Sequence, residues 1–169
     1  MAFSKILIPK ERINSLIGRN GTVRKIIEEK TGVKLFIHSA LGEVDISGQD
    51  SLGIMDAEQV IKAIGRGFNP SVAFKLFEDE YVMEIIDLSD FKVKSKNRKL
   101  TLRGRIIGKK GITRRIIEQY TGCWIAVFGK TVSIIGDSMN ISYARQAIEM
   151  ILEGSEQGTA YKFLKKVYK

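Results

Sequence analysis

The chain has 169 residues, of which 44% are hydrophobic and 28% charged, and it carries a formal net charge of +9. These values exclude a disordered chain and suit two small folded domains. A single cysteine excludes an intramolecular disulfide, and no segment resembles a signal peptide or the roughly 18 apolar residues of a membrane span, so we expect a cytoplasmic protein.

The first half of the chain predicts an alternation of strands and helices. β-Branched and aromatic residues indicate the strands, while glycines and apolar positions at helical spacing indicate the helices. The second helix is expected to face the core with both Ile26 and Ile27. The order is strand, helix, helix, strand, strand, helix. The six elements are expected at residues 3–8, 11–17, 21–31, 33–38, 43–47 and 51–64.

The second half predicts the same order, with a longer and strongly basic connection at residues 89–98. Its six elements are expected at residues 81–88, 99–107, 111–120, 123–128, 131–135 and 138–153. Between the halves, Asn69-Pro70 predicts a stop followed by a short amphipathic helix, too apolar for a free tether. We therefore expect the two domains to pack together. The predicted segments are a first domain at 1–67, a helical connector at 68–79, a second domain at 80–154 and a helical tail at 155–169.

The repeated order reflects an internal duplication. Residues 16–32 reappear ninety positions later as residues 106–122, and both stretches contain Gly-x-x-Gly, then Ile-Ile-Glu and a Thr-Gly. Such self-similarity fixes the architecture before any single element is assigned.

Each copy has a Gly-x-x-Gly turn between its first two helices. We call the turn of the first copy the first clamp (residues 18–21) and that of the second copy the second clamp (residues 108–111). Glycine lets the backbone turn sharply and a sugar-phosphate chain approach closely. The following helix directs its free N–H groups and the positive end of its dipole outward. A lone Gly-x-x-Gly is more often an ordinary turn between helices, but two copies in this element order predict an anion-binding site. The middle positions carry side chains able to contact phosphates, namely Arg19, Asn20, Lys109 and Lys110.

Both halves resemble the KH domain of type I, whose signature is Ile-Gly-x-x-Gly between its first two helices. The resemblance implies an α+β fold with two βααββα domains, each a three-stranded antiparallel sheet covered by three helices. It also implies a groove for about four nucleotides of single strand, gripped at the backbone by the glycine loop. One departure is that Arg24 and Arg114 stand where many KH domains have an aliphatic residue, which is shifted here to Ile26 and Ile116.

The predicted RNA-binding residues are the two clamps and their neighbours. Ile17 and Ile107 either form the floor of a base groove or pack the ends of helices, and both interpretations stay open. The set is Ile17, Gly18, Arg19, Asn20, Gly21, Arg24, Lys25, Arg105, Ile107, Gly108, Lys109, Lys110, Gly111, Arg114 and Arg115.

The fused pair of copies is similar to the archaeal ribosome-assembly KH proteins of the Dim family, partners of the Nob endonuclease. This similarity implies binding near the 3′ end of small-subunit ribosomal RNA during maturation. It also implies contact with the alpha subunit of translation initiation factor two.

Positive charge is concentrated around the second clamp. Residues 1–67 hold ten basic and eight acidic groups, whereas residues 101–169 hold twelve and five. Eleven Lys or Arg residues and no acid lie between Lys92 and Ile117. Such a run releases counterions from a phosphate backbone, although taken alone it is as well explained by a solvated loop. We expect the second clamp to contribute most of the RNA affinity.

Other functions are weighed against RNA binding. An enzyme is disfavoured, because a P-loop needs four residues between its glycines and only three separate Gly104 from Gly108,. We predict no catalytic residues, no cofactor and no metal site, since the acids are scattered and His38 has no evident partner. The alternatives are a protein–protein scaffold or a general mRNA-binding regulator. Trp124 and Phe128 either stack on bases or pack against the other domain.

Overall fold

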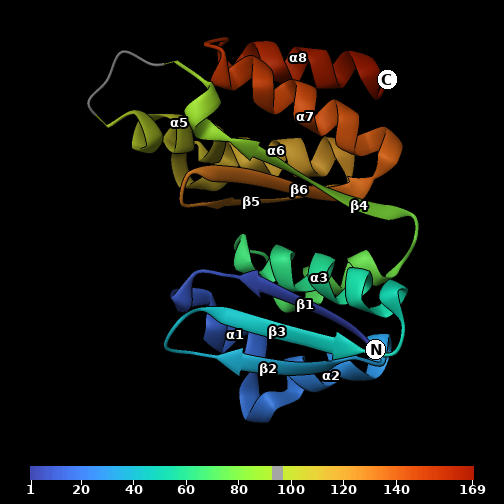
Figure 1. Cartoon of the computed structure of the whole chain (residues 1–169). Coiled ribbons are helices and arrows are strands. Elements are labelled where there is room, and N and C mark those ends of the chain that lie inside the picture. Colours follow the sequence, from blue (N-terminus) through green and yellow to red (C-terminus); the bar gives the residue numbers. More distant parts are fainter. Residues whose placement is uncertain (93–96) are drawn as a thin grey trace. The chain divides into compact units, whose positions relative to one another are not determined.

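The computed structural model describes residues 1–92 and 97–169, and the chain divides into two compact units, Met1–Asp79 and Glu80–Lys169 (Figure 1). The predicted basic connection at 89–98 lies partly outside the described residues. The packing of one domain against the other stays a prediction. Within the described residues, no helix has both the length and the hydrophobicity needed to cross a bilayer.

The first unit is a three-stranded antiparallel sheet, in the order β1-β3-β2, with its core on one face. Val44 and Ile46 on the central strand are fully buried, whereas Phe3 and Phe36 on the other face are 67% and 65% exposed. This alternation is the signature of a sheet that helices cover on one side. The elements are β1 (Ala2–Leu7), α1 (Ile13–Ile17), α2 (Thr22–Thr31), β2 (Lys34–His38), β3 (Glu43–Gly48) and α3 (Ser51–Gly65).

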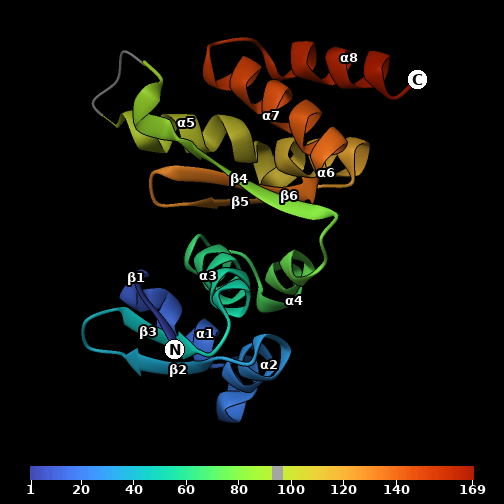
Figure 2. The same cartoon turned by 45° about the vertical axis from the view of Figure 1, so that its right-hand side comes forward.

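The second unit repeats this topology with the strand order β4-β6-β5. Its core joins the sheet to three helices of the repeat and to one helix that the first unit lacks. That helix, α8 (Gln157–Val167), packs against α6 and α7 (Figures 1 and 2). The other elements are β4 (Tyr81–Asp87), α5 (Arg98–Ile107), α6 (Ile112–Thr121), β5 (Trp124–Phe128), β6 (Thr131–Asp137) and α7 (Ser138–Leu152).

Local signals define where the helices begin and end. The Asp50 carboxylate accepts the Leu52 N–H at the start of α3, and Asp137 accepts the Asn140 N–H at the start of α7, both at 3.0 Å,. The backbone N–H bond to the Asp137 carboxylate also lowers its pKa. Near the end of the first unit, Asn69 caps the short helix α4 (Pro70–Ala73), which continues as a 3-10 turn over Phe74–Phe77.

The α+β class and the βααββα order are confirmed in both units. The first helix of the first unit is shorter than expected, because the segment after Pro9 begins as a 3-10 turn over Lys10–Arg12. The expectation for Ile26 is wrong, because it is 36% exposed while Ile27 is fully buried. Neighbouring helical positions point about 100° apart, so one of the two residues must turn away from the core.

Candidate nucleic-acid interface

The two clamps follow the same backbone path although their middle residues differ. Gly18 has φ/ψ of 76°/173° and Gly108 has 74°/174°. The third residue of each clamp is in the left-handed region, with φ/ψ of 55°/28° at Asn20 and 56°/28° at Lys110. This region is costly for a side-chain-bearing residue and commoner for asparagine than for lysine. The conformation is therefore set by the glycines and the flanking helices rather than by the middle side chains.

The glycines of a clamp are needed for different reasons. A Cβ on Gly18 would collide with the side chain of Val23, and one on Gly108 with the Oγ1 atom of Thr113. The second glycine of each clamp has a φ of +74° and no comparably close neighbour. Both glycines therefore permit a positive φ, and the first also permits the close packing of the next helix,.

Each clamp leads directly into a ten-residue helix, α2 or α6. The first N–H groups of a helix have no acceptor within it, and its dipole favours an anion at this end. Arg19, Asn20, Lys109 and Lys110 are all exposed. The N–H groups of Gly21 and Gly111 already donate to the carbonyls of Gly18 and Gly108. Each clamp thus offers the positive end of a helix dipole and polar side chains to an approaching phosphate, with two cations in the second clamp and one in the first.

In each unit one glutamate contacts both an arginine of its own helix and the edge strand of the sheet. Sequence reasoning missed this feature. Glu28 Oε1 lies 3.7 Å from Arg24 Nε, while its Oε2 accepts the Leu35 N–H at 2.9 Å. The repeated Ile-Ile-Glu was the available signal. The equivalent residues of the second unit are Arg114, Glu118 and Ile125, with distances of 3.8 Å and 2.9 Å. The Glu28 carboxylate therefore links α2 to β2, and the Glu118 carboxylate links α6 to β5. Each positions a predicted RNA-binding arginine beside the strand.

The second clamp has an additional internal contact. Arg115 Nη2 donates a hydrogen bond of 2.8 Å to the carbonyl of Lys110. Lys25, which is exposed, occupies the equivalent position in the first unit. The bond keeps the Arg115 guanidinium at the clamp, whose backbone angles match those of the first clamp, where no such bond is seen among the described residues.

Helix α8 contacts both sides of the second clamp. Gln157 Nε2 donates to the carbonyl of Arg105, in the last turn of α5, at 3.0 Å. The Tyr161 hydroxyl donates to Thr113 Oγ1, in the first turn of α6, also at 3.0 Å. Sequence reasoning could identify the apolar face of this segment but not these polar contacts, because they join residues about fifty positions apart.

The remaining sequence candidates belong to strands rather than to the clamps. Trp124 packs edge-on against Tyr81, with ring centroids 5.9 Å apart, and the choice between base stacking and domain packing stays open for it and for Phe128. His38 Nε2 lies 3.0 Å from Asp45 Oδ2, a partner that the sequence did not reveal. Among residues 1–92 and 97–169 no group of three metal-ligating side chains is found.

Family models agree with the geometry of both halves. A model described as the eukaryotic type KH domain, KH type I, matches residues 82–169. A second KH-domain model matches residues 4–63.

Individual relatives extend the match to the whole chain. A KH domain-containing protein of Methanocaldococcus jannaschii is 46% identical over 163 residues, which cover 94% of this chain and 71% of the relative. The RNA-binding protein pno1 of Dictyostelium discoideum is 27% identical over 169 residues, with 96% and 70% covered. A chain in the crystal structure of the a/eIF2alpha–aDim2p–rRNA complex from Pyrococcus horikoshii matches with a TM-score of 0.90 and 41% identity, covering 99% of this chain and 94% of that one. The chain therefore belongs to the KH family of RNA-binding proteins and carries two type I domains of the Dim2 and PNO1 kind.

Proposed function

We propose that this protein binds single-stranded RNA near the 3′ end of small-subunit ribosomal RNA and acts in ribosome assembly. The observation that carries the proposal is the pair of glycine clamps, which share one backbone conformation and present exposed polar and cationic side chains. The similarity to a chain in a complex that contains ribosomal RNA supports the choice of RNA class.

The clamps suit a single strand because they grip a backbone and leave its bases free. KH domains hold about four nucleotides in this way. In our proposal the glycine turns and helix N-termini bind phosphates, and Arg24, Arg105, Arg114 and Arg115 contribute charge around them. Ile17 and Ile107, half-buried beside the clamps, would form the apolar floor for bases.

We further propose that the chain is a binding protein without catalytic activity and that it works in the cytoplasm. The clamps provide amides and cations, which bind phosphates, rather than a nucleophile activated by a neighbouring base. The alpha subunit of translation initiation factor two is a proposed partner, supported by its presence in the complex with aDim2p. The Nob endonuclease is proposed as a partner from the family resemblance alone.

Fluorescence anisotropy tests the RNA proposal. A labelled oligonucleotide with the 3′-terminal sequence of small-subunit ribosomal RNA is titrated with the protein, beside a scrambled strand and a duplex of the same length. We expect preferential binding of the specific single strand and an affinity that falls steeply between roughly 50 and 200 mM salt. Equal affinity for duplex and single strand would overturn the clamp mechanism, and equal affinity for the scrambled strand would overturn the ribosomal assignment.

A further inference from the structure

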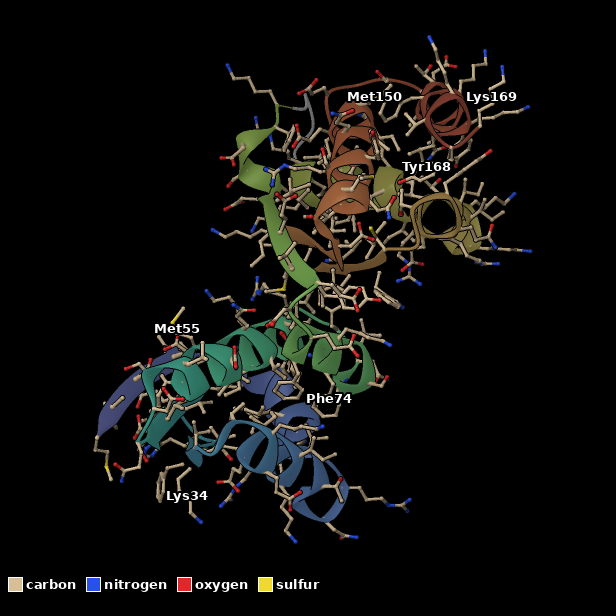
Figure 3. The ribbon with its side chains drawn as sticks, turned by 90° about the vertical axis from the view of Figure 1, so that its right-hand side faces the viewer. Lys34, Met55, Phe74, Met150, Tyr168 and Lys169 are labelled. Carbon is tan, nitrogen blue, oxygen red and sulfur yellow. The ribbon has the colours of Figure 1, made fainter. Side chains whose placement is uncertain are left out.

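Helix α8 has one buried face and one face composed largely of lysines. Ala160 and Leu164 are fully buried against the core of the second unit. Side chains repeat every 3.6 residues, so positions two residues away from the buried ones point outward. In Figure 3 nitrogen-tipped side chains extend from α8 near Lys169. The exposed lysines, which we call the lysine face, are Lys162, Lys165, Lys166 and Lys169.

The lysine face is not neutralised by the protein's own acids. No acidic residue follows Glu156 in the sequence. Within the described part of the chain, no ion pair involves a lysine of this face, whereas Lys5 and Lys130 are each paired with carboxylates. Three like charges on one side of an eleven-residue helix, with a fourth at Lys169 two residues beyond its end, create a field that attracts a polyanion,.

The lysine face begins next to the second clamp. The bonds from Gln157 to the Arg105 carbonyl and from Tyr161 to Thr113 fix the first turns of α8 beside the helices that flank this clamp. A recess of about 510 Å³ beside the first turn of α8 is lined by Arg105, Ile151 and residues 154–158, with Glu156 as its one acid. Lys162 follows Tyr161 directly. Because a helix rises 1.5 Å per residue, the lysine face extends about 6 Å along the helix from Lys162 to Lys166, and Lys169 follows beyond the last helical residue,.

We propose that the lysine face binds the phosphates of RNA nucleotides that flank those held in the second clamp. This inference rests on the proposed RNA-binding function and lengthens its binding site beyond the four nucleotides that a KH domain holds. A nucleic-acid strand is favoured over an acidic protein because the face continues a phosphate-binding surface already present at Lys109, Lys110 and Arg115. The site is sequence-independent, since lysine contacts to phosphates carry charge but no base information.

The test compares oligonucleotides of two lengths with the variant K162Q/K165Q/K166Q. One RNA has about five nucleotides and fills a clamp alone, and the other has about twelve and extends past it. We expect the variant to bind the short RNA as the native protein does and to bind the long RNA at least about tenfold more weakly at 100 mM salt. The slope of log affinity against log salt for the long RNA should fall by about 2, since each single-strand phosphate contact contributes about 0.7.

A matched variant, K10Q/K30Q/K62Q, removes three exposed lysines from the first unit and thus the same total charge. It should keep the affinity of the native protein for both RNAs. The inference is overturned if the α8 variant binds the long RNA normally, if it loses both RNAs equally, or if the matched variant loses as much. Failure of the native protein to bind either RNA would instead refute the proposed function.

Discussion

The two units have the same clamp and different surroundings. The backbone angles of the clamps agree within a few degrees, yet Met1–Asp79 carries a net charge of +1 and Glu80–Lys169 one of +8. The helix before the clamp has five residues in the first unit and ten in the second. The comparison teaches that glycines set the shape of the clamp, and we expect the residues around it to set how strongly it binds phosphate.

The helices before the clamps are also anchored differently. In the first unit Arg12 donates to the carbonyls of Ile64 and Phe68, at 2.8 and 2.9 Å, and so ties the start of α1 to the end of α3. In the second unit Gln157 of α8 anchors the end of the helix before the clamp, and Tyr161 of α8 also anchors the start of the helix after it, so both bonds lie next to the clamp itself. We expect the second clamp to be the more rigid of the two.

Charge reversal in the clamps should give the largest difference between the units. The variant K109D/K110D should weaken RNA binding about a hundredfold, because phosphate contacts are replaced by repulsion. The variant R19D/N20D should weaken binding less, since its surroundings hold fewer cations. Anisotropy titrations at fixed salt measure both, and equal losses would contradict the ranking of the clamps.

Substitution of the first glycine should destabilise its unit more than substitution of the second. Gly108→Ala combines a positive φ with a collision at Thr113, so we expect a loss of about 3 kcal/mol in the free energy of unfolding,. Gly111→Ala meets only the backbone penalty and should cost about 1 kcal/mol. Urea unfolding followed by the fluorescence of Trp124, the single tryptophan, reports on the second unit. The collision argument fails if the two variants unfold alike.

Removal of one hydroxyl tests whether α8 supports the clamp. Tyr161→Phe leaves the buried Thr113 hydroxyl without its donor and should cost about 1 kcal/mol of stability together with a few-fold loss of RNA affinity,. Tyr168→Phe is the matched control, because it removes a comparable bond to Asn140 at the other end of the segment. The control should lose stability without losing affinity; parallel effects in both variants would show that α8 has only a structural role.

The paired glutamates allow the two clamps to be compared at constant geometry. Glu118→Gln keeps an acceptor for the Ile125 N–H but frees the charge of Arg114. RNA affinity should rise a few-fold and its salt slope by about 0.7. Glu28→Gln makes the same change beside Arg24. An increase confined to Glu118→Gln would mean that the first clamp does not contact the RNA.

The smallest effect on the protein is expected from a substitution between similar buried side chains in the core. Cys123 and Val33 occupy equivalent buried positions, each 3% exposed, so Cys123→Val should change the unfolding free energy by less than about 1.5 kcal/mol at pH 7,. Burial raises the pKa of the Cys123 thiol from 9.0 to about 11. The unfolded thiol therefore ionises first, and the native protein should lose stability as pH rises from 9 to 11. Urea titrations at pH 7 and pH 10 should show a smaller decrease for the valine variant; an equal decrease would contradict this.

Local chemistry made much of the fold predictable. Caps such as Asp50 and Asp137, and the left-handed glycines that end α2 and α6, act over a few residues and are visible in the sequence. The failure at Ile26 arose because neighbouring apolar residues do not reveal which one a helix turns toward its core. The positions of both clamps could be predicted because a Gly-x-x-Gly turn, like a cap, depends on a few neighbouring residues.

The sequence by itself determined the duplication, the order of elements and the glycine turns, because these depend on spacing and on backbone freedom at single residues. Only the tertiary structure decided which groups surround each turn. The Glu118 bond to the Ile125 N–H, the Tyr161 bond to Thr113 and the outward lysines of α8 all depend on which helix packs beside which strand. Contacts between residues far apart in the chain arise from the packing of a whole core, and no local pattern encodes them.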